Sequence, residues 1–264
     1  KAARKWGYEK KGVTPDRAEI IAVSENFHGR TISIVSFSSE AQYREGFGPF
    51  TPGFRLIPFG DLEALRSAIG PNTVAFLAEP IQGEAGVVIP PAGYLAAAAE
   101  ICRENRVLTI WDEIQSGLGR TGKLFAYEHD GVGAKPDLLV LGKALSGGVY
   151  PVSAVVGRSE VLGVFRPGDH GSTYGGNPLA SAVAQAAIDA LVEEKMVENS
   201  DRLGKKLRAG LSGISSPLVA EIRVRGLWAG IELKESAGPA RAYCLKLVER
   251  GVLAKDTRTQ VIRL

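Results

Sequence analysis

Leu138-Leu139-Val140-Leu141-Gly142-Lys143-Ala144-Leu145-Ser146-Gly147-Gly148 is the stretch of sequence that gives the clearest indication of the fold. Its four leading apolar residues predict a short, fully buried strand, and a glycine ends that strand. A lysine follows two residues beyond the strand end. A strand that is apolar on both sides is typical of a parallel sheet with helices on both faces.

The same pattern recurs on either side of this stretch. Further strands are expected at residues 20–23, 74–78, 107–111 and 152–156, and helices at 93–105 and 178–196. These alternating elements predict an α/β fold with a mainly parallel sheet. From about residue 197 the pattern changes to helices at 200–211 and 239–250 and strands at 219–224, 227–233 and 261–264. We therefore expect a large domain over residues 1–196 and a small C-terminal α+β domain over 197–264.

Composition narrows the range of partners and locations. The chain has 264 residues, 45% of them hydrophobic, and a formal net charge of +3. No basic run interleaves with aromatics, and no apolar run approaches the roughly 20 residues of a membrane span, so neither nucleic acid nor membrane is an expected partner. Cys102 and Cys244 fit neither a metal spacing nor a disulfide framework. We expect no metal site and a reducing, cytoplasmic location.

Both ends of the sequence look cut. Residues 1–7 read as the last turns of a helix that lacks a start signal, and the apolar strand at 261–264 has nothing after it. We therefore expect the large domain to lack its N-terminal part and the small domain its C-terminal end. A targeting peptide could precede residue 1.

Two ionisable residues are expected at the carboxyl ends of strands, where ligands bind in open α/β sheets. Asp112 follows the apolar run at 107–111, and Lys143 follows the run at 138–141. A carboxylate in such a place is costly to bury unless a cation meets it. Taken singly, either residue is better explained as a strand-end group in a salt bridge or in solvent.

Five blocks of sequence, in order along the whole chain, strengthen the functional interpretation. They are Phe27-His28-Gly29-Arg30-Thr31, Glu79-Pro80-Ile81-Gln82-Gly83-Glu84, Asp112-Glu113-Ile114-Gln115, Leu141 to Gly148, and Gly171-Ser172-Thr173-Tyr174-Gly175-Gly176-Asn177-Pro178. Together they resemble the class III aminotransferases of fold type I. The resemblance implies the fold type I transferase architecture and pyridoxal 5'-phosphate (PLP) as cofactor.

The resemblance also implies roles around the cofactor ring. Lys143 is expected to bond covalently to PLP, and Asp112 to hold the proton on the pyridine nitrogen through a charge-assisted hydrogen bond. Gln115 is expected to reach the phenolic oxygen, and Phe27 to stack on the ring face, although plain core packing also explains Phe27. His28 is expected beside the cofactor as neighbouring structure, not as acid or base.

Ser172 and Thr173 are expected to serve the cofactor phosphate of a neighbouring subunit. Their hydroxyls precede the helix that opens at Pro178, a place that suits an anion. The resemblance therefore implies a homodimer with shared active sites, while a simple helix N-terminal turn remains the alternative. It also places the family's Gly/Ser-rich phosphate loop just upstream of Lys1, outside this sequence.

Within the family, the likeness is to members that transfer the δ-amino group of ornithine to 2-oxoglutarate, giving glutamate 5-semialdehyde and glutamate. Arg30 resembles the arginine that holds the α-carboxylate of ornithine, a fork suited to bidentate pairing. Arg263 resembles an arginine that pairs with Glu84 while ornithine is bound and is released for 2-oxoglutarate; a static salt bridge is the alternative. An N-acetylornithine or 4-aminobutyrate transaminase, or a non-catalytic homologue, are the competing interpretations.

Overall fold

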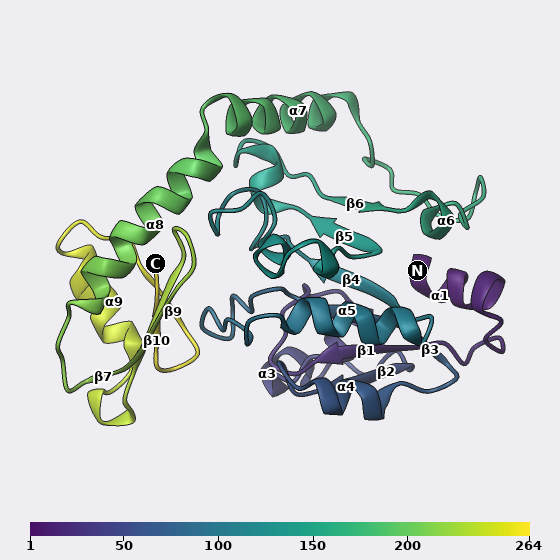
Figure 1. The fold of residues 1–264 in the computed structure, drawn as a ribbon, viewed down its shortest axis with the longest axis horizontal. Helices are drawn as coiled ribbons and strands as arrows, with labels where there is room; N and C mark the ends of the chain where they lie inside the picture. Colours follow the sequence, from purple (N-terminus) through teal and green to yellow (C-terminus); the bar gives the residue numbers. More distant parts are fainter.

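The computed structural model describes residues 1–264 and places a six-stranded sheet at its centre (Figure 1). The strands lie in the order β2-β1-β3-β4-β5-β6. All neighbours are parallel except β5 and β6, which are antiparallel. The strand bounds are β1 Glu19–Val23, β2 Phe54–Ile57, β3 Thr73–Ala78, β4 Leu108–Asp112, β5 Leu138–Leu141 and β6 Ala154–Gly157. The predicted α/β fold with a mainly parallel sheet is confirmed.

Helices cover both faces of this sheet, which explains why its strands are almost continuously apolar. On one face, Ile21, Phe76 and Trp111 pack with α4 and α5 in the largest core cluster. On the other face, Ile20 and Leu108 pack with α1 and α6 in a second cluster. The helices are α1 Ala2–Trp6, α2 Ile32–Val35, α3 Ala41–Arg44, α4 Leu62–Ala68, α5 Tyr94–Glu104, α6 Ser159–Leu162, α7 Pro178–Glu193, α8 Met196–Ser212 and α9 Ala240–Val248.

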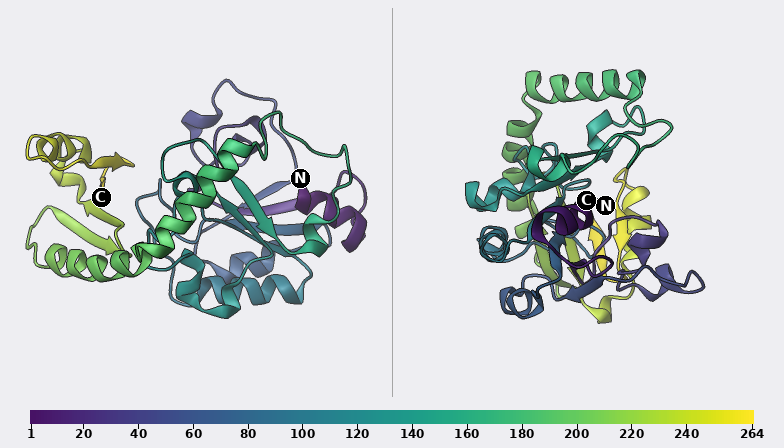
Figure 2. Two further views of the ribbon diagram at one scale, coloured as in Figure 1. Left: turned by 90° about the horizontal axis from the view of Figure 1, so that it is seen from above. Right: turned by 90° about the vertical axis from the view of Figure 1, so that its right-hand side faces the viewer.

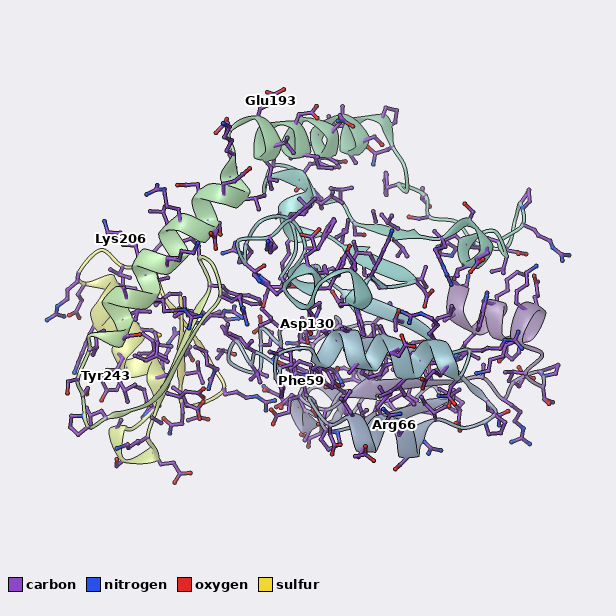
Figure 3. All side chains as sticks on the ribbon, viewed as in Figure 1. Phe59, Arg66, Asp130, Glu193, Lys206 and Tyr243 are labelled. Atoms are coloured by element: carbon purple, nitrogen blue, oxygen red, sulfur yellow. The ribbon has the colours of Figure 1, made fainter.

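Strand β4 is anchored firmly at the centre of the core. Trp111 is fully buried, meets Phe76 edge to face with ring centroids 5.8 Å apart, and donates from Nε1 to the carbonyl of Ala134 at 2.7 Å. Helix α5, which leads into β4, begins where the carboxylate of Asp130 accepts the N–H groups of Gly93 and Leu95 (Figure 3). These contacts fix the position of Asp112 at the end of β4.

The prediction of one long helix over residues 178–196 is wrong at its C-terminal end. Helix α7 ends at Glu193, and α8 begins at Met196 in a new direction (Figure 1). Lys195 has a left-handed backbone, with φ at 52°, which interrupts the helical hydrogen bonds. The helix expected at 200–211 is the greater part of α8.

A second sheet lies beside the first, toward the C-terminus (Figure 2). Its antiparallel strands lie in the order β7-β8-β10-β9, with β7 Val219–Val224, β8 Ala229–Leu233, β9 Lys255–Thr257 and β10 Val261–Arg263. Trp228 packs on Ile81 and Val87 of the loop after β3, and Arg223 donates to the carbonyl of Gly86. The small sheet is thereby docked against the same edge of the large sheet that holds Asp112. A domain boundary near residue 197 stays a prediction.

Several boundaries differ from the sequence-based expectation. Asp112 is the last residue of β4 and not the first one after it, and the strand expected at 152–156 is β6, two residues later and antiparallel. The helix expected to close near Gly7 continues as a π-helical turn, η1 Gly7–Lys11. The remaining short elements are the 3-10 helices η2 Ala126–Asp130, η3 Val132–Ala134, η4 Lys143–Ser146 and η5 Glu235–Ala237. No helix is both long and apolar enough to span a membrane.

Candidate active site

The carboxyl ends of β1, β3, β4 and β5 meet at one edge of the large sheet because these adjacent strands are parallel. Polar residues follow each strand at this edge. A cavity of about 120 Å³ opens there, lined by Phe27, His28, Gly29, Glu79, Glu84, Asp112, Ile114, Gln115 and Lys143. Most of the ring-site residues predicted from sequence therefore surround one cavity.

Asp112 and His28 form a buried pair at the base of this cavity. The His28 Nδ1 atom lies 2.7 Å from Asp112 Oδ2, and their side chains are 2% and 8% exposed. Burial lowers the pKa of His28, but the hydrogen bond to Asp112 and its charge outweigh burial and raise that pKa above its usual value. Asp112 Oδ1 accepts the N–H of Ile114 at 3.1 Å. Each carboxylate oxygen keeps a lone pair for a further donor.

Glu79 is a buried carboxyl in the site that our sequence reasoning did not select. Its Oε1 accepts the N–H of Phe27 at 2.9 Å, and its Oε2 accepts the N–H of Gly83 at 3.3 Å. Burial raises the pKa of Glu79 to about 7, although these two N–H groups and His28 oppose that shift. Glu79 thus connects the loop that carries Phe27 with the loop that carries Glu84.

Lys143 stands where three cavities meet. Its backbone has φ at 42°, a left-handed conformation that non-glycine residues rarely adopt and that is common at functional sites. The residue as a whole is exposed in this chain. Its ammonium end is partly enclosed, and this desolvation lowers the pKa of Lys143 although Glu84, Asp112 and Glu79 oppose the shift.

Glu84, Gln115 and Arg263 form one hydrogen-bonded group above the cavity. Arg263 Nη1 lies 2.8 Å from Glu84 Oε1, and Gln115 Nε2 donates to the same oxygen at 3.2 Å. Arg263 Nη1 also lies 3.4 Å from Gln115 Oε1. Burial tends to raise the pKa of Glu84, but Arg263 and Gln115 hold it at about 2. The predicted contact between Glu84 and Arg263 is present, and Gln115, expected to face the cofactor, joins it.

Gly83 makes this close packing possible. A Cβ atom at Gly83 would lie 1.5 Å from Gln115 Oε1 and 2.8 Å from the Trp228 ring, so any larger residue would displace Gln115. The glycine therefore lets the loop after β3 pass directly over the end of β4. This contact holds the Gln115 amide against Glu84.

Phe27 and Arg30 lie on the loop after β1. Phe27 meets Tyr43 edge to face with ring centroids 5.9 Å apart. The Arg30 guanidinium carbon lies 3.7 Å from the Tyr43 ring centroid and 5.4 Å from that of Phe27. Arg30 is exposed and forms no ion pair, so its fork is available for a carboxylate ligand.

Ser172 and Thr173 lie apart from the ring-site cavity. Ser172 lines a separate cavity of about 640 Å³ with Lys143, Tyr150 and Asn177, whereas Thr173 lines none of the three cavities at Lys143. Asn177 caps α7 by accepting the N–H of Ala180 at 2.9 Å, with Pro178 in the first turn. The role of both hydroxyls toward a neighbouring subunit stays a prediction.

Glu113, directly after Asp112, is a second buried carboxyl that the sequence reasoning did not select. Its side chain accepts the Ser116 hydroxyl at 2.5 Å and the N–H of Tyr127 at 2.9 Å. Burial raises its pKa to about 7 in spite of these donors. Glu113 thereby folds the loop that carries Gln115 back onto the end of β4.

Glu113→Gln is expected to flatten the dependence of stability on pH. A folded pKa of about 7 against 4.5 when exposed means that the folded state binds the extra proton. The contribution of Glu113 to the free energy of unfolding is therefore fully present below pH 4.5. It is lost as the pH rises toward 7, by on the order of 2–3 kcal/mol. Glutamine keeps both contacts, accepting from Tyr127 and donating to Ser116. Urea unfolding at pH 5 and pH 8 should show a smaller difference in the variant; an unchanged difference would contradict this role.

Comparison with known proteins agrees with this geometry. A family model described as aminotransferase class-III matches residues 1–264. The chain belongs to the class-III aminotransferase family. Members of this family are PLP enzymes, and the residues at the cavity fit that cofactor: a buried carboxylate at Asp112, a lysine of lowered pKa at Lys143, and a buried His28 Nε2 that has no partner in the chain.

Relatives within the class-III family include ornithine aminotransferases. The one from Bacillus subtilis (strain 168) is 57% identical over all of this chain and 64% of its own length, and that from Bacillus cereus (strain Q1) is 56% identical over 65% of its length. The chain thus spans about 64–65% of these curated relatives. The crystal structure of the Toxoplasma gondii ME49 ornithine aminotransferase matches with a TM-score of 0.95 at 49% identity, covering all of this chain and 63% of that one.

An acetylornithine aminotransferase is also similar. The crystal structure of that enzyme from Elizabethkingia anophelis matches with a TM-score of 0.87 at 47% identity, covering all of this chain and 65% of that one. Its identity to this chain is close to that of the Toxoplasma protein. The likeness to solved structures alone therefore does not select the amino donor.

Proposed function

We propose that this protein transfers the δ-amino group of ornithine to 2-oxoglutarate with PLP as its cofactor. The observation that carries the proposal is the cavity lined by Lys143, Asp112 and Glu84, together with the pairing of Glu84 with Arg263. It unites a reactive amine, a buried carboxylate and a masked arginine. The ornithine aminotransferases among the relatives at 55–57% identity support this choice of donor.

Asp112, Gln115, Phe27 and His28 would hold the cofactor ring. PLP, when bound, withdraws electrons from the bonds at the substrate carbon that bears the amine. Asp112 would present its carboxylate to the ring nitrogen, and the 2.7 Å hydrogen bond from His28 fixes the orientation of that carboxylate.

Lys143 would provide the covalent attachment and then carry the proton. Its lowered pKa makes the amine more readily neutral, and only the neutral amine is a nucleophile or a base. A free Lys143 amine would also be able to take a proton from the substrate carbon and return it. The left-handed backbone at residue 143 aims this side chain toward the cavity that Asp112 lines.

Arg30 and Arg263 would anchor the two substrates differently. Arg30 is unpaired and takes the α-carboxylate of ornithine, while Glu84 neutralises Arg263. For 2-oxoglutarate, Glu84 releases Arg263 to bind a substrate carboxylate. Ser172 and Thr173 would serve the cofactor phosphate of a second subunit in a homodimer, so that each active site draws on both chains.

An acetylornithine transaminase is the second candidate, favoured by the Elizabethkingia structure. Holoenzyme should be assayed with 2-oxoglutarate and, in turn, ornithine, N-acetylornithine and 4-aminobutyrate. We expect kcat/KM to be at least about tenfold higher for ornithine, a discrimination of 1.4 kcal/mol. Preference for another donor would replace the proposed substrate, and no turnover with any donor would favour a non-catalytic homologue.

Glu84→Ala is expected to affect the two half-reactions in opposite directions. Without Glu84, Arg263 is always free to bind a carboxylate, so the glutamate half-reaction should tighten or speed up. The ornithine half-reaction should weaken by about tenfold and lose preference for the δ-amine, because Arg263 now competes with Arg30. Stopped-flow spectra of the separate half-reactions measure this. Equal damage to both halves would indicate a static salt bridge.

A further inference from the structure

Glu84 contacts a second cation, Lys255, through its other carboxylate oxygen. Arg263 Nη1 lies 2.8 Å from Glu84 Oε1, whereas Lys255 Nζ lies 3.3 Å from Glu84 Oε2. Arg263 and Lys255 are directly paired residues on the antiparallel strands β10 and β9. Side chains at paired positions lie on the same face of a sheet, so these two cations stand side by side over one carboxylate.

Two like charges at paired positions repel each other unless an opposite charge lies between them. Glu84 supplies that charge, and its loop is also fastened to β9, because the Thr257 hydroxyl donates to the carbonyl of Glu84. The three side chains in contact carry a net charge of +1. The group therefore has one unmatched positive charge. A dicarboxylate such as 2-oxoglutarate has one carboxylate more than ornithine, and that second carboxylate matches this charge.

We propose that Lys255 is a positioning residue that keeps Glu84 paired when Arg263 turns to a substrate carboxylate. This inference rests on the proposed function. It adds a second cation, Lys255, that stays with Glu84 when Arg263 is released. Lys255 acts on Glu84 and not on the cofactor.

The burial of the three side chains supports this role of Lys255. Glu84 is 24% exposed and Arg263 15%, so neither charge is fully solvated once the pair opens. An unpaired, half-buried carboxylate is costly. Gln115 would give Glu84 only a neutral hydrogen bond after release, whereas Lys255 gives a cation. Lys255 is 62% exposed, so its long side chain has room to follow Glu84 as it moves.

The experiment compares Lys255→Met with Lys255→Arg in the holoenzyme, each with Glu84 present and in a Glu84→Ala background. Lys234→Met is the matched control, because Lys234 is an exposed lysine of the small sheet region that forms no ion pair. The first readout is the dissociation constant of glutarate, an unreactive dicarboxylate, by calorimetry. The second is the separate ornithine and 2-oxoglutarate half-reactions.

We expect Lys255→Met to weaken glutarate binding and 2-oxoglutarate saturation by about tenfold, with the ornithine half-reaction within about twofold. Lys255→Arg should restore binding, and Lys234→Met should have no effect. In the Glu84→Ala background the effect of Lys255→Met should vanish.

An effect of equal size in that background would overturn the proposal, because Lys255 would then act by general attraction alone. Loss of both half-reactions equally would also overturn it. If unaltered holoenzyme bound glutarate but did not use ornithine, the proposed function would fail and not the role of Lys255.

Discussion

Lys143→Ala is expected to abolish turnover while leaving the protein folded. The substitution removes both the amine that would attach to PLP and the base that would carry the proton, so kcat should fall by at least about 10³-fold. Lys143 is exposed and packs in no core cluster, so the thermal midpoint should change little. Steady-state transaminase assays and thermal unfolding measure the two effects.

The matched control is Lys135→Ala. Lys135 is also exposed but precedes β5, whereas Lys143 follows it, so the two lysines flank opposite ends of one strand. Its removal should leave kcat unchanged. Full activity of Lys143→Ala, or equal losses in both variants, would contradict the placement of the active site at the carboxyl edge of the sheet.

Asp112→Asn is expected to keep the cofactor bound but slow turnover by about 10²–10³-fold, or 3–4 kcal/mol of barrier. The amide removes the negative charge that would keep the ring nitrogen protonated. It also removes the charge that raises the pKa of His28, so that pKa should fall as burial takes over. The kcat and an NMR titration of the His28 ring measure the two consequences.

Asp130→Asn is a suitable control because this carboxylate caps α5 and does not line the cavity. It should lower stability through the weaker cap and leave kcat unchanged. Near-normal turnover of Asp112→Asn together with an unchanged His28 titration would mean that Asp112 is only a structural partner of the strand end.

The sequence predicted the large sheet well because its strands are buried on both faces and read as apolar runs. Asp112 and Lys143 were identified because they interrupt such runs at a strand end. The same rule applies to Glu79, which follows β3, but the proline directly after it makes an ordinary strand end an equally simple interpretation. The structure shows instead that its carboxyl accepts the N–H groups of two loops.

Other elements gave no signal in the sequence. Strand β2 is an edge strand whose middle residues, Arg55 and Leu56, are exposed, so its pattern is not that of a buried run. The break at Lys195 has neither glycine nor proline. Lys255 could not be linked to Glu84, 171 positions earlier, without the pairing of β9 with β10. Contacts between the two sheets depend on tertiary structure and not on local pattern.

Borohydride treatment of the holoenzyme, followed by mass spectrometry of its peptides, shows which lysine binds PLP. The reagent fixes a covalent link between PLP and a lysine amine, and the modified lysine can then be located. We expect the added mass on the peptide that contains Lys143 and on no other, with simultaneous loss of activity. A modification on another lysine, or none on any peptide of an active enzyme, would contradict this expectation.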